Sequence, residues 1–102
     1  MRMYKLYAGL NDKDAREQLI PTADALALVR ERLDGVKQDA TIYTAQGIYT
    51  HEDGGRVHEN TIVIEIMFTP YDVVVEIARD LKRALNQESI ALQVFEMEGA
   101  LI

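Results

Sequence analysis

The stretch from 45 to 66, AQGIYTHEDGGRVHENTIVIEI, constrains the fold more than any other part of the chain. Two segments that alternate apolar and polar residues flank Asp53-Gly54-Gly55. Tight hairpin turns need a positive φ, which glycine adopts without steric cost. We therefore expect antiparallel strands at 40–51 and 56–68, joined by this turn. Gly47 interrupts the alternation of the first strand and predicts a β-bulge.

Two further strands are indicated by the same period of two. The segments 3–10 (MYKLYAGL) and 90–97 (IALQVFEM) both alternate and are rich in aromatic or branched residues. The segment 11–21, NDKDAREQLIP, is polar and ends in proline, so we expect a surface loop with at most one helical turn.

Helical periodicity appears twice, at 22–35 and from about 70 to 86. Threonine can cap a helix N-terminus with its side-chain oxygen, so we expect Thr22 and Thr69 to be N-caps. The buried stripes that the spacing predicts are Leu26, Val29 and Leu33 in the first helix, and Val74, Ile77, Ala78, Leu81, Ala84 and Leu85 in the second.

The predicted order is β-α-β-β-α-β, the α+β arrangement called ferredoxin-like. Right-handed crossovers place both helices on one face of a four-stranded antiparallel sheet with strand order 4-1-3-2. The 102 residues fit one such domain, 1–102. With 48% apolar and 27% charged residues, the chain can bury a core of ordinary size.

Composition narrows the functional classes. The chain has no cysteine, which excludes disulfides, a thiolate nucleophile and cysteine-ligated metal, and agrees with a cytoplasmic location. Its formal charge of −6 and scattered bases argue against nucleic acid or an anionic membrane surface as a partner. We see neither a secretion signal nor a spanning segment, and we expect no cofactor.

One face of the predicted sheet is left without helices. If Tyr4, Leu6 and Ile64 face the helices, alternation assigns the residues between them to this bare face. Its expected members are Lys5, Tyr7, Val63, Glu65, Met67, Gln93, Phe95 and Met97. A solvated face would be more polar, so we expect self-association, with a small-molecule pocket as a second use of the same face.

Glu65 is the best catalytic candidate, because it is an acid inside an apolar strand. The predicted strand order puts it near Tyr7, and a covering subunit would raise its pKa and suit it to acid–base catalysis. The ordinary alternative is that Glu65 pairs with Lys5 on the neighbouring strand.

The hairpin tip holds a second group of candidates: Tyr49, His51, Asp53, Gly54, Gly55 and His58. The two histidines would lie close across the strands and could bind zinc together with a carboxylate. Adjacent His-Glu pairs point to opposite faces, however, so the four side chains cannot all converge. Solubility of an exposed tip is the simpler interpretation.

Four segments resemble a small bacterial family of domains of unknown function. They are LYAG (6–9), AQGIY (45–49), GGRVHENTIVI (54–64) and NQESIALQV (86–94). The chain departs from that family at Tyr49, where tryptophan is commoner, and the resemblance implies no activity. More loosely, the topology and the long hairpin are similar to the PII and ACT ligand-sensing modules, which is an analogy of fold.

These observations predict a homo-oligomeric binding or regulatory domain that uses the bare face and the hairpin. The alternative is a small enzyme of the dimeric α+β barrel type, with Glu65 and Tyr7 in a pocket between subunits. Its expected partners are another copy of itself and a small molecule.

Overall fold

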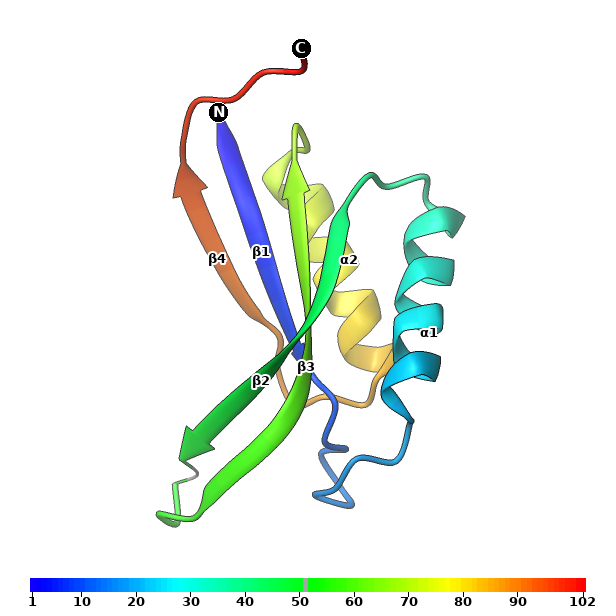
Figure 1. Ribbon diagram of the computed structural model, residues 1–102, viewed down its shortest axis with the longest axis vertical. Coiled ribbons are helices and arrows are strands. Elements are labelled where there is room, and N and C mark those ends of the chain that lie inside the picture. Colours follow the sequence, from blue (N-terminus) through cyan, green and yellow to red (C-terminus); the bar gives the residue numbers. More distant parts are fainter. Residues whose placement is uncertain (51) are drawn as a thin grey trace.

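The computed structural model describes residues 1–50 and 52–102, and its centre is a single four-stranded sheet (Figure 1). The strands are β1 (Arg2–Gly9), β2 (Thr41–Thr50), β3 (Arg56–Met67) and β4 (Ala91–Glu96). They are ordered β2-β3-β1-β4, and every neighbouring pair is antiparallel. The predicted ferredoxin-like topology and the order 4-1-3-2 are confirmed.

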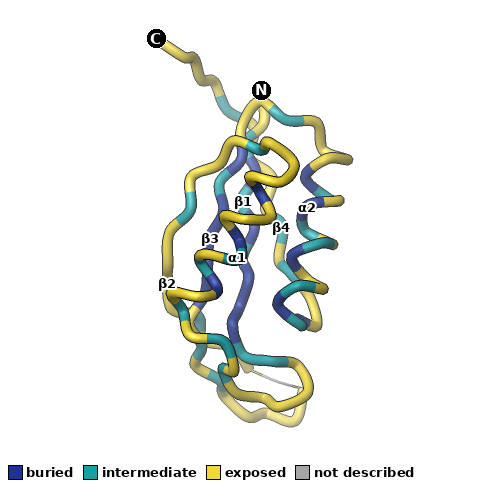
Figure 2. Tube along the Cα trace, turned by 90° about the vertical axis from the view of Figure 1, so that its right-hand side faces the viewer, coloured by how far each residue is buried: buried dark blue, intermediate teal, exposed yellow. Residues whose placement is uncertain are grey.

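Two helices of equal length cover one face of this sheet (Figure 1). They are α1 (Thr22–Gly35) and α2 (Tyr71–Ala84). The core lies between helices and sheet, where Figure 2 shows buried stretches of the chain. Leu6, Ile64 and Leu81 are completely buried. Burying one such side chain contributes about 1.5–3 kcal/mol, so alternation in the strands and periodicity in the helices both select this face. No helix in the described ranges is long and apolar enough to cross a membrane.

The helix starts differ from the sequence prediction by one residue. The N-caps are Pro21 and Pro70, and neither helix has a side-chain cap. The hydroxyl of Thr69 instead donates to the carbonyl of Met67 (2.9 Å) and accepts from the side-chain amide of Gln38 (3.0 Å). The threonine therefore serves a loop contact rather than the helix end. In α1 the buried stripe is Ala25, Val29 and Leu33, while the predicted Leu26 is only partly buried.

The β2–β3 hairpin has the predicted turn but lacks the predicted bulge. Gly54 has a φ of +87°, and the backbone N–H of Gly55 donates to Asp53 Oδ1 (2.8 Å). The pairing runs without interruption from Thr41 opposite Glu65 to Thr50 opposite Arg56. The bulge prediction at Gly47 was wrong.

A close contact occupies the space beside Gly47. A Cβ placed on Gly47 would lie 2.6 Å from Cε2 of Tyr49, whose ring lies across that position. The hairpin also extends past the end of β1, which pairs with β3 only as far as Gly9 opposite Thr61 (Figure 1). One further backbone bond links the two sides, from the N–H of Leu10 to the carbonyl of Asn60 (2.9 Å), and beyond it the described residues of β2 and β3 pair with each other.

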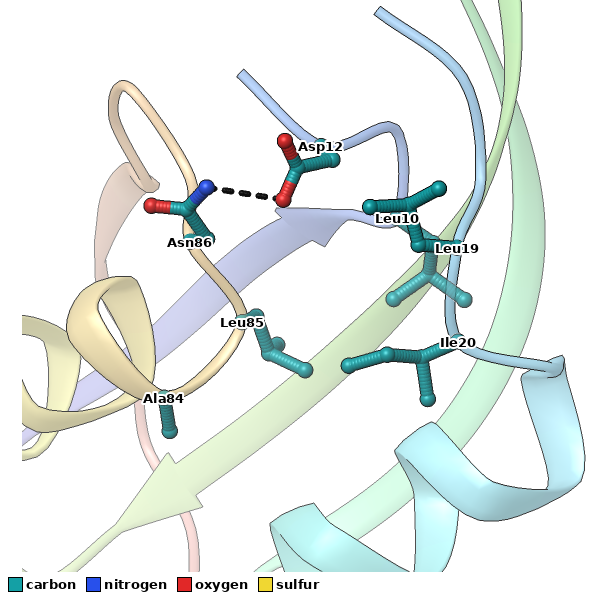
Figure 3. Close-up of a pocket in the computed structure, with 7 residues that line it drawn as sticks. All are labelled: Leu10, Asp12, Leu19, Ile20, Ala84, Leu85 and Asn86. Carbon is teal, nitrogen blue, oxygen red and sulfur yellow. Dashed lines mark hydrogen bonds between the residues drawn. The ribbon is translucent and has the colours of Figure 1, made fainter. Parts of the chain in front are cut away.

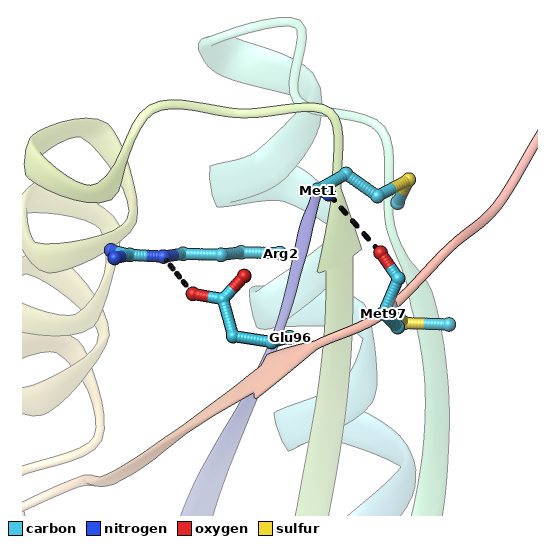
Figure 4. A network of polar contacts seen from close by, with 4 residues as sticks. All are labelled: Met1, Arg2, Glu96 and Met97. Carbon is cyan, nitrogen blue, oxygen red and sulfur yellow. Dashed lines mark hydrogen bonds and ion pairs between the residues drawn. The ribbon is translucent and has the colours of Figure 1, made fainter.

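Three contacts hold the outer parts of the chain against the sheet and helices. The N-terminal amine donates to the carbonyl of Met97 (3.1 Å), and Arg2 Nε lies 2.7 Å from Glu96 Oε1 (Figure 4). At the other end, Asn86 Nδ2 donates to Asp12 Oδ1 (2.7 Å) and holds the 11–21 loop against the end of α2. Backbone N–H groups of this loop and the Asn86 amide lower the pKa of Asp12.

Candidate functional site

The bare face of the sheet carries one connected polar cluster, formed by Lys5, Glu65 and Tyr43. The register places Lys5 opposite Glu65, and Tyr43 opposite Val63, so Tyr43 is one row away from the carboxylate. Lys5 Nζ lies 3.6 Å from Glu65 Oε2, and the Tyr43 hydroxyl donates to the same oxygen at 2.9 Å. The side chains of Lys5 and Glu65 are each 25% exposed.

Contacts within the cluster shift two of its pKa values. The hydrogen bond to Glu65, followed by desolvation, raises the pKa of Tyr43, because ionisation would place two negative charges together. For Lys5, burial acts to lower the pKa, but attraction to Tyr43 and Glu65 outweighs it, so the net change is upward. The cluster therefore favours a protonated lysine and a neutral phenol beside Glu65.

Apolar side chains surround this cluster and remain open. Tyr43, Met67 and Phe95 are 37–40% exposed, and Lys5 Nζ lies 5.5 Å from the centre of the Phe95 ring. That distance suits a cation–π contact. Within the described chain no element covers this face, which combines a fixed ion pair with exposed aromatic and methionine side chains.

The strand residues predicted for the bare face lie on that side of the sheet. The hydrogen-bond partner of Tyr7 differs from the expected one. Glu65 contacts Lys5 and Tyr43, whereas the Tyr7 hydroxyl donates to Gln93 Oε1 (2.6 Å). Glu65 and Tyr7 lie one row apart, and among the described residues no hydrogen bond joins them. Val63 is 2% exposed although it is on the bare face, and Met97 lies just beyond β4.

Tyr43 was not among the candidates, although a signal for it exists. It alternates with Ile42 and Thr44, which puts it on the bare face. The hairpin register then brings it one row from Glu65. The turn and the alternation together could have identified it.

The hairpin tip does not form a metal site in the part of the chain that the structure describes. No group of three or more histidine, aspartate or glutamate side chains could hold a metal ion within residues 1–50 and 52–102. His58 pairs with Ile48 in the register. The predicted proximity of the two histidines depends on His51, which lies outside the described residues.

Two small cavities lie away from the bare face. One of about 170 Å³ is lined by Leu10, Ile20 and Leu85, together with Asp12 and Asn86 (Figure 3). Another of about 180 Å³ lies between the helices near Val36 and Val73. Both are below the usual size of a small-molecule site, roughly 300–1,000 Å³.

Solved structures share this fold. A phage SAM lyase in complex with S-methyl-5'-thioadenosine superposes with a TM-score of 0.71 at 22% identity, over 93% of this chain and 80% of that chain. The divalent cation tolerance protein CutA from Archaeoglobus fulgidus gives 0.62 at 14% identity, over 99% and 88%. The GlnK–ATP complex from B. subtilis gives 0.52 at 15% identity, over 95% and 84%.

These similarities concern the fold, because each identity is below 25%. The likeness to PII modules that the topology suggested is confirmed at that level by GlnK. No protein-family model matches the sequence, and no curated protein sequence matches it.

Proposed function

We propose that this protein is a self-associating domain that binds a small ligand on the bare face of its sheet. The observation that carries the proposal is the Lys5–Glu65–Tyr43 cluster inside an exposed apolar surface. Covering a lone carboxylate would cost several kcal/mol. Glu65 already has two partners, so a second copy or a ligand can cover it at lower cost.

The proposed ligand is an adenine nucleoside or a derivative of one. Two proteins of the same fold were solved with such molecules, S-methyl-5'-thioadenosine in the phage SAM lyase and ATP in GlnK. In this chain, Tyr7, Tyr43 and Tyr49 occupy alternating positions of the bare face. Tyrosine rings stack on bases, with about 1–3 kcal/mol per stacked base in nucleic-acid complexes.

Light scattering and titration calorimetry test the two halves of this proposal. We expect a mass greater than one chain at micromolar concentration, and saturable binding of adenosine, S-methyl-5'-thioadenosine or ATP. Tyr43→Phe removes the hydroxyl that holds Glu65 and should weaken binding at least tenfold. A monomer that binds none of the three compounds would refute the proposal.

A second candidate function is the release of S-methyl-5'-thioadenosine from SAM, favoured by the TM-score of 0.71 to the phage lyase. With Glu65 as base, a proton leaves the carbon β to sulfur, a C=C bond forms, and the carbon–sulfur electron pair stays on sulfur. The products are a neutral thioether and an unsaturated amino acid, so no water or oxidant is consumed.

Chromatography of protein incubated with SAM distinguishes the two candidates. The lyase predicts S-methyl-5'-thioadenosine in amounts that grow with time, and its loss in Glu65→Gln. Product at the uncatalysed rate would reject the enzyme and leave the binding domain as the remaining candidate.

The proposal also includes the cytoplasmic location expected from the sequence. Fractionation of the producing cells tests this location.

A further inference from the structure

A row of small residues crosses the bare face where the hairpin leaves the rest of the sheet. The register places Gly9, Thr61 and Ala45 side by side on β1, β3 and β2, and Gly47 follows two residues later on β2. We call these four residues the trough. Their side chains are much smaller than those of the row above it, where Tyr7, Val63 and Tyr43 lie.

The trough is flanked by a carboxylate with an available oxygen. Glu59 lies over Gly9, so closely that a Cβ there would collide with the carboxylate. Its Oε2 accepts from the backbone N–H of Asn11 at 3.0 Å. Among the described residues, no hydrogen bond or ion pair engages Oε1. The ring of Tyr49 bounds the trough over Gly47.

The floor of the trough holds a buried hydroxyl without a partner. Thr61 is 2% exposed, and its Oγ1 makes no hydrogen bond with any described residue. Leaving a buried polar group unpaired costs about 1–3 kcal/mol, so such a group in a folded protein calls for an explanation. Valine would fill the same space at this position without that cost.

We propose that the trough binds the ribose of the nucleoside, with its vicinal hydroxyls hydrogen-bonded to Glu59 Oε1 and Thr61 Oγ1. This inference rests on the proposed function and names the part of the bare face that recognises the ligand. In the dinucleotide sites of Rossmann folds, a carboxylate accepts a hydrogen bond from a ribose hydroxyl. The adjacent Tyr43 and Tyr49 rings offer surfaces for the base. Entry requires the ring of Tyr49 to rotate away from the trough, which leaves Glu59 in place to accept the ribose hydroxyl.

The variant Thr61→Val tests the role of the hydroxyl, because it keeps the shape and removes only the polar atom. Without ligand, we expect the unfolding temperature to stay the same or rise. Affinity for adenosine should fall at least tenfold in calorimetry. Thr44→Val is the matched control, because Thr44 is on the same strand pair but exposed on the opposite face. It should change neither quantity.

A comparison of adenosine with 2',3'-dideoxyadenosine tests the diol itself. The unmodified protein should bind the dideoxy compound at least tenfold more weakly, and Glu59→Gln or Thr61→Val should reduce that difference. Equal affinities for the two compounds would overturn the inference. So would a preference for adenosine that survives in both variants.

The outcomes also separate this inference from the proposed function. If adenosine binding depends on Tyr43 and Glu65 but not on Glu59 and Thr61, the bare face binds the ligand and the trough does not. If adenosine and its derivatives fail to bind at all, both proposals fail.

Discussion

At the scale of single residues, two glycines on the bare face, Gly9 and Gly47, each lie beneath a long side chain. Gly9 leaves room for the carboxylate of Glu59, and that carboxylate in turn holds the backbone of Asn11. Gly47 leaves room for the ring of Tyr49. Neither position has the positive φ for which glycine is usually required.

Replacing Gly9 by alanine should therefore destabilise the protein. The new Cβ would displace the Glu59 carboxylate and break its hydrogen bond to Asn11, at a cost of about 1–3 kcal/mol. Denaturant titration of the free energy of unfolding measures the change. Gly35→Ala is the control, because nothing lies within 4 Å of a Cβ there and alanine favours helix. Equal effects of the two substitutions would contradict this interpretation.

The pKa shifts of the polar cluster predict a dependence on alkaline pH. Tyr43 and Lys5 both have raised pKa values in the folded protein, relative to ordinary values of 10.0 and 10.5. Their stabilising contribution is complete below those ordinary values and is lost as pH rises through the raised ones. We expect the unfolding temperature to fall above about pH 10.

Substitution of Glu65 by glutamine should reduce this dependence, because the charge that raises the pKa of Tyr43 is removed. Titration of tyrosine absorbance near 295 nm should show one phenol that ionises at lower pH in the variant than in the unmodified protein. An unchanged titration would mean that Tyr43 does not bond to Glu65 in solution.

At the scale of elements, the hairpin and the central strands differ in how they are supported. β1 pairs on both sides, and its side chain Leu6 is completely buried. The projecting part of the hairpin, near Ile48 and Val57, pairs only within itself, and Ile48 is 53% exposed. Local stability follows such differences in burial and pairing.

Hydrogen exchange should report this difference directly. We expect the amides of 48–50 and 56–58 to exchange much faster than those of 4–8 and 62–66 in the protein without ligand. Binding of a ligand at the trough should slow exchange at the base of the hairpin more than at its tip. Uniform protection along β3 would contradict the description of the hairpin as a separate, weaker element.

At the scale of the whole molecule, the two sides of the sheet differ in how far their side chains are exposed. The side that the helices cover holds most of the buried core, while the bare face keeps exposed apolar side chains around a paired carboxylate. Exposed apolar patches of this kind are typical of surfaces that meet a partner.

A charge placed on the bare face should therefore disrupt the self-association that we propose. We expect Met67→Glu to give a lower mass by light scattering than the unmodified protein at the same concentration. Val73→Glu is a fair control, because Val73 is also 40% exposed but lies on α2. If both substitutions leave the mass unchanged, the bare face is not the surface that associates.

The sequence by itself determined the order of elements, the hairpin turn and the face to which each strand residue belongs. These follow from local rules: glycine permits the turn, and period two separates Leu6 from Lys5 and Tyr7. The bulge at Gly47 and the caps at Thr22 and Thr69 were wrong. The two threonine hydroxyls instead accept hydrogen bonds from the side-chain amides of Gln18 and Gln38. The ring of Tyr49 fills the space beside Gly47.

Only the tertiary structure decided which side chains meet. The hydrogen bond from Tyr43 to Glu65, the insertion of Glu59 beside Gly9 and the burial of the Thr61 hydroxyl all depend on strand register and on rotamers across neighbouring strands. A shift of one residue in that register would move every one of these groups to the other face. The pattern of alternation thus defines the bare face, and the packing of long side chains over small ones defines the candidate site on it.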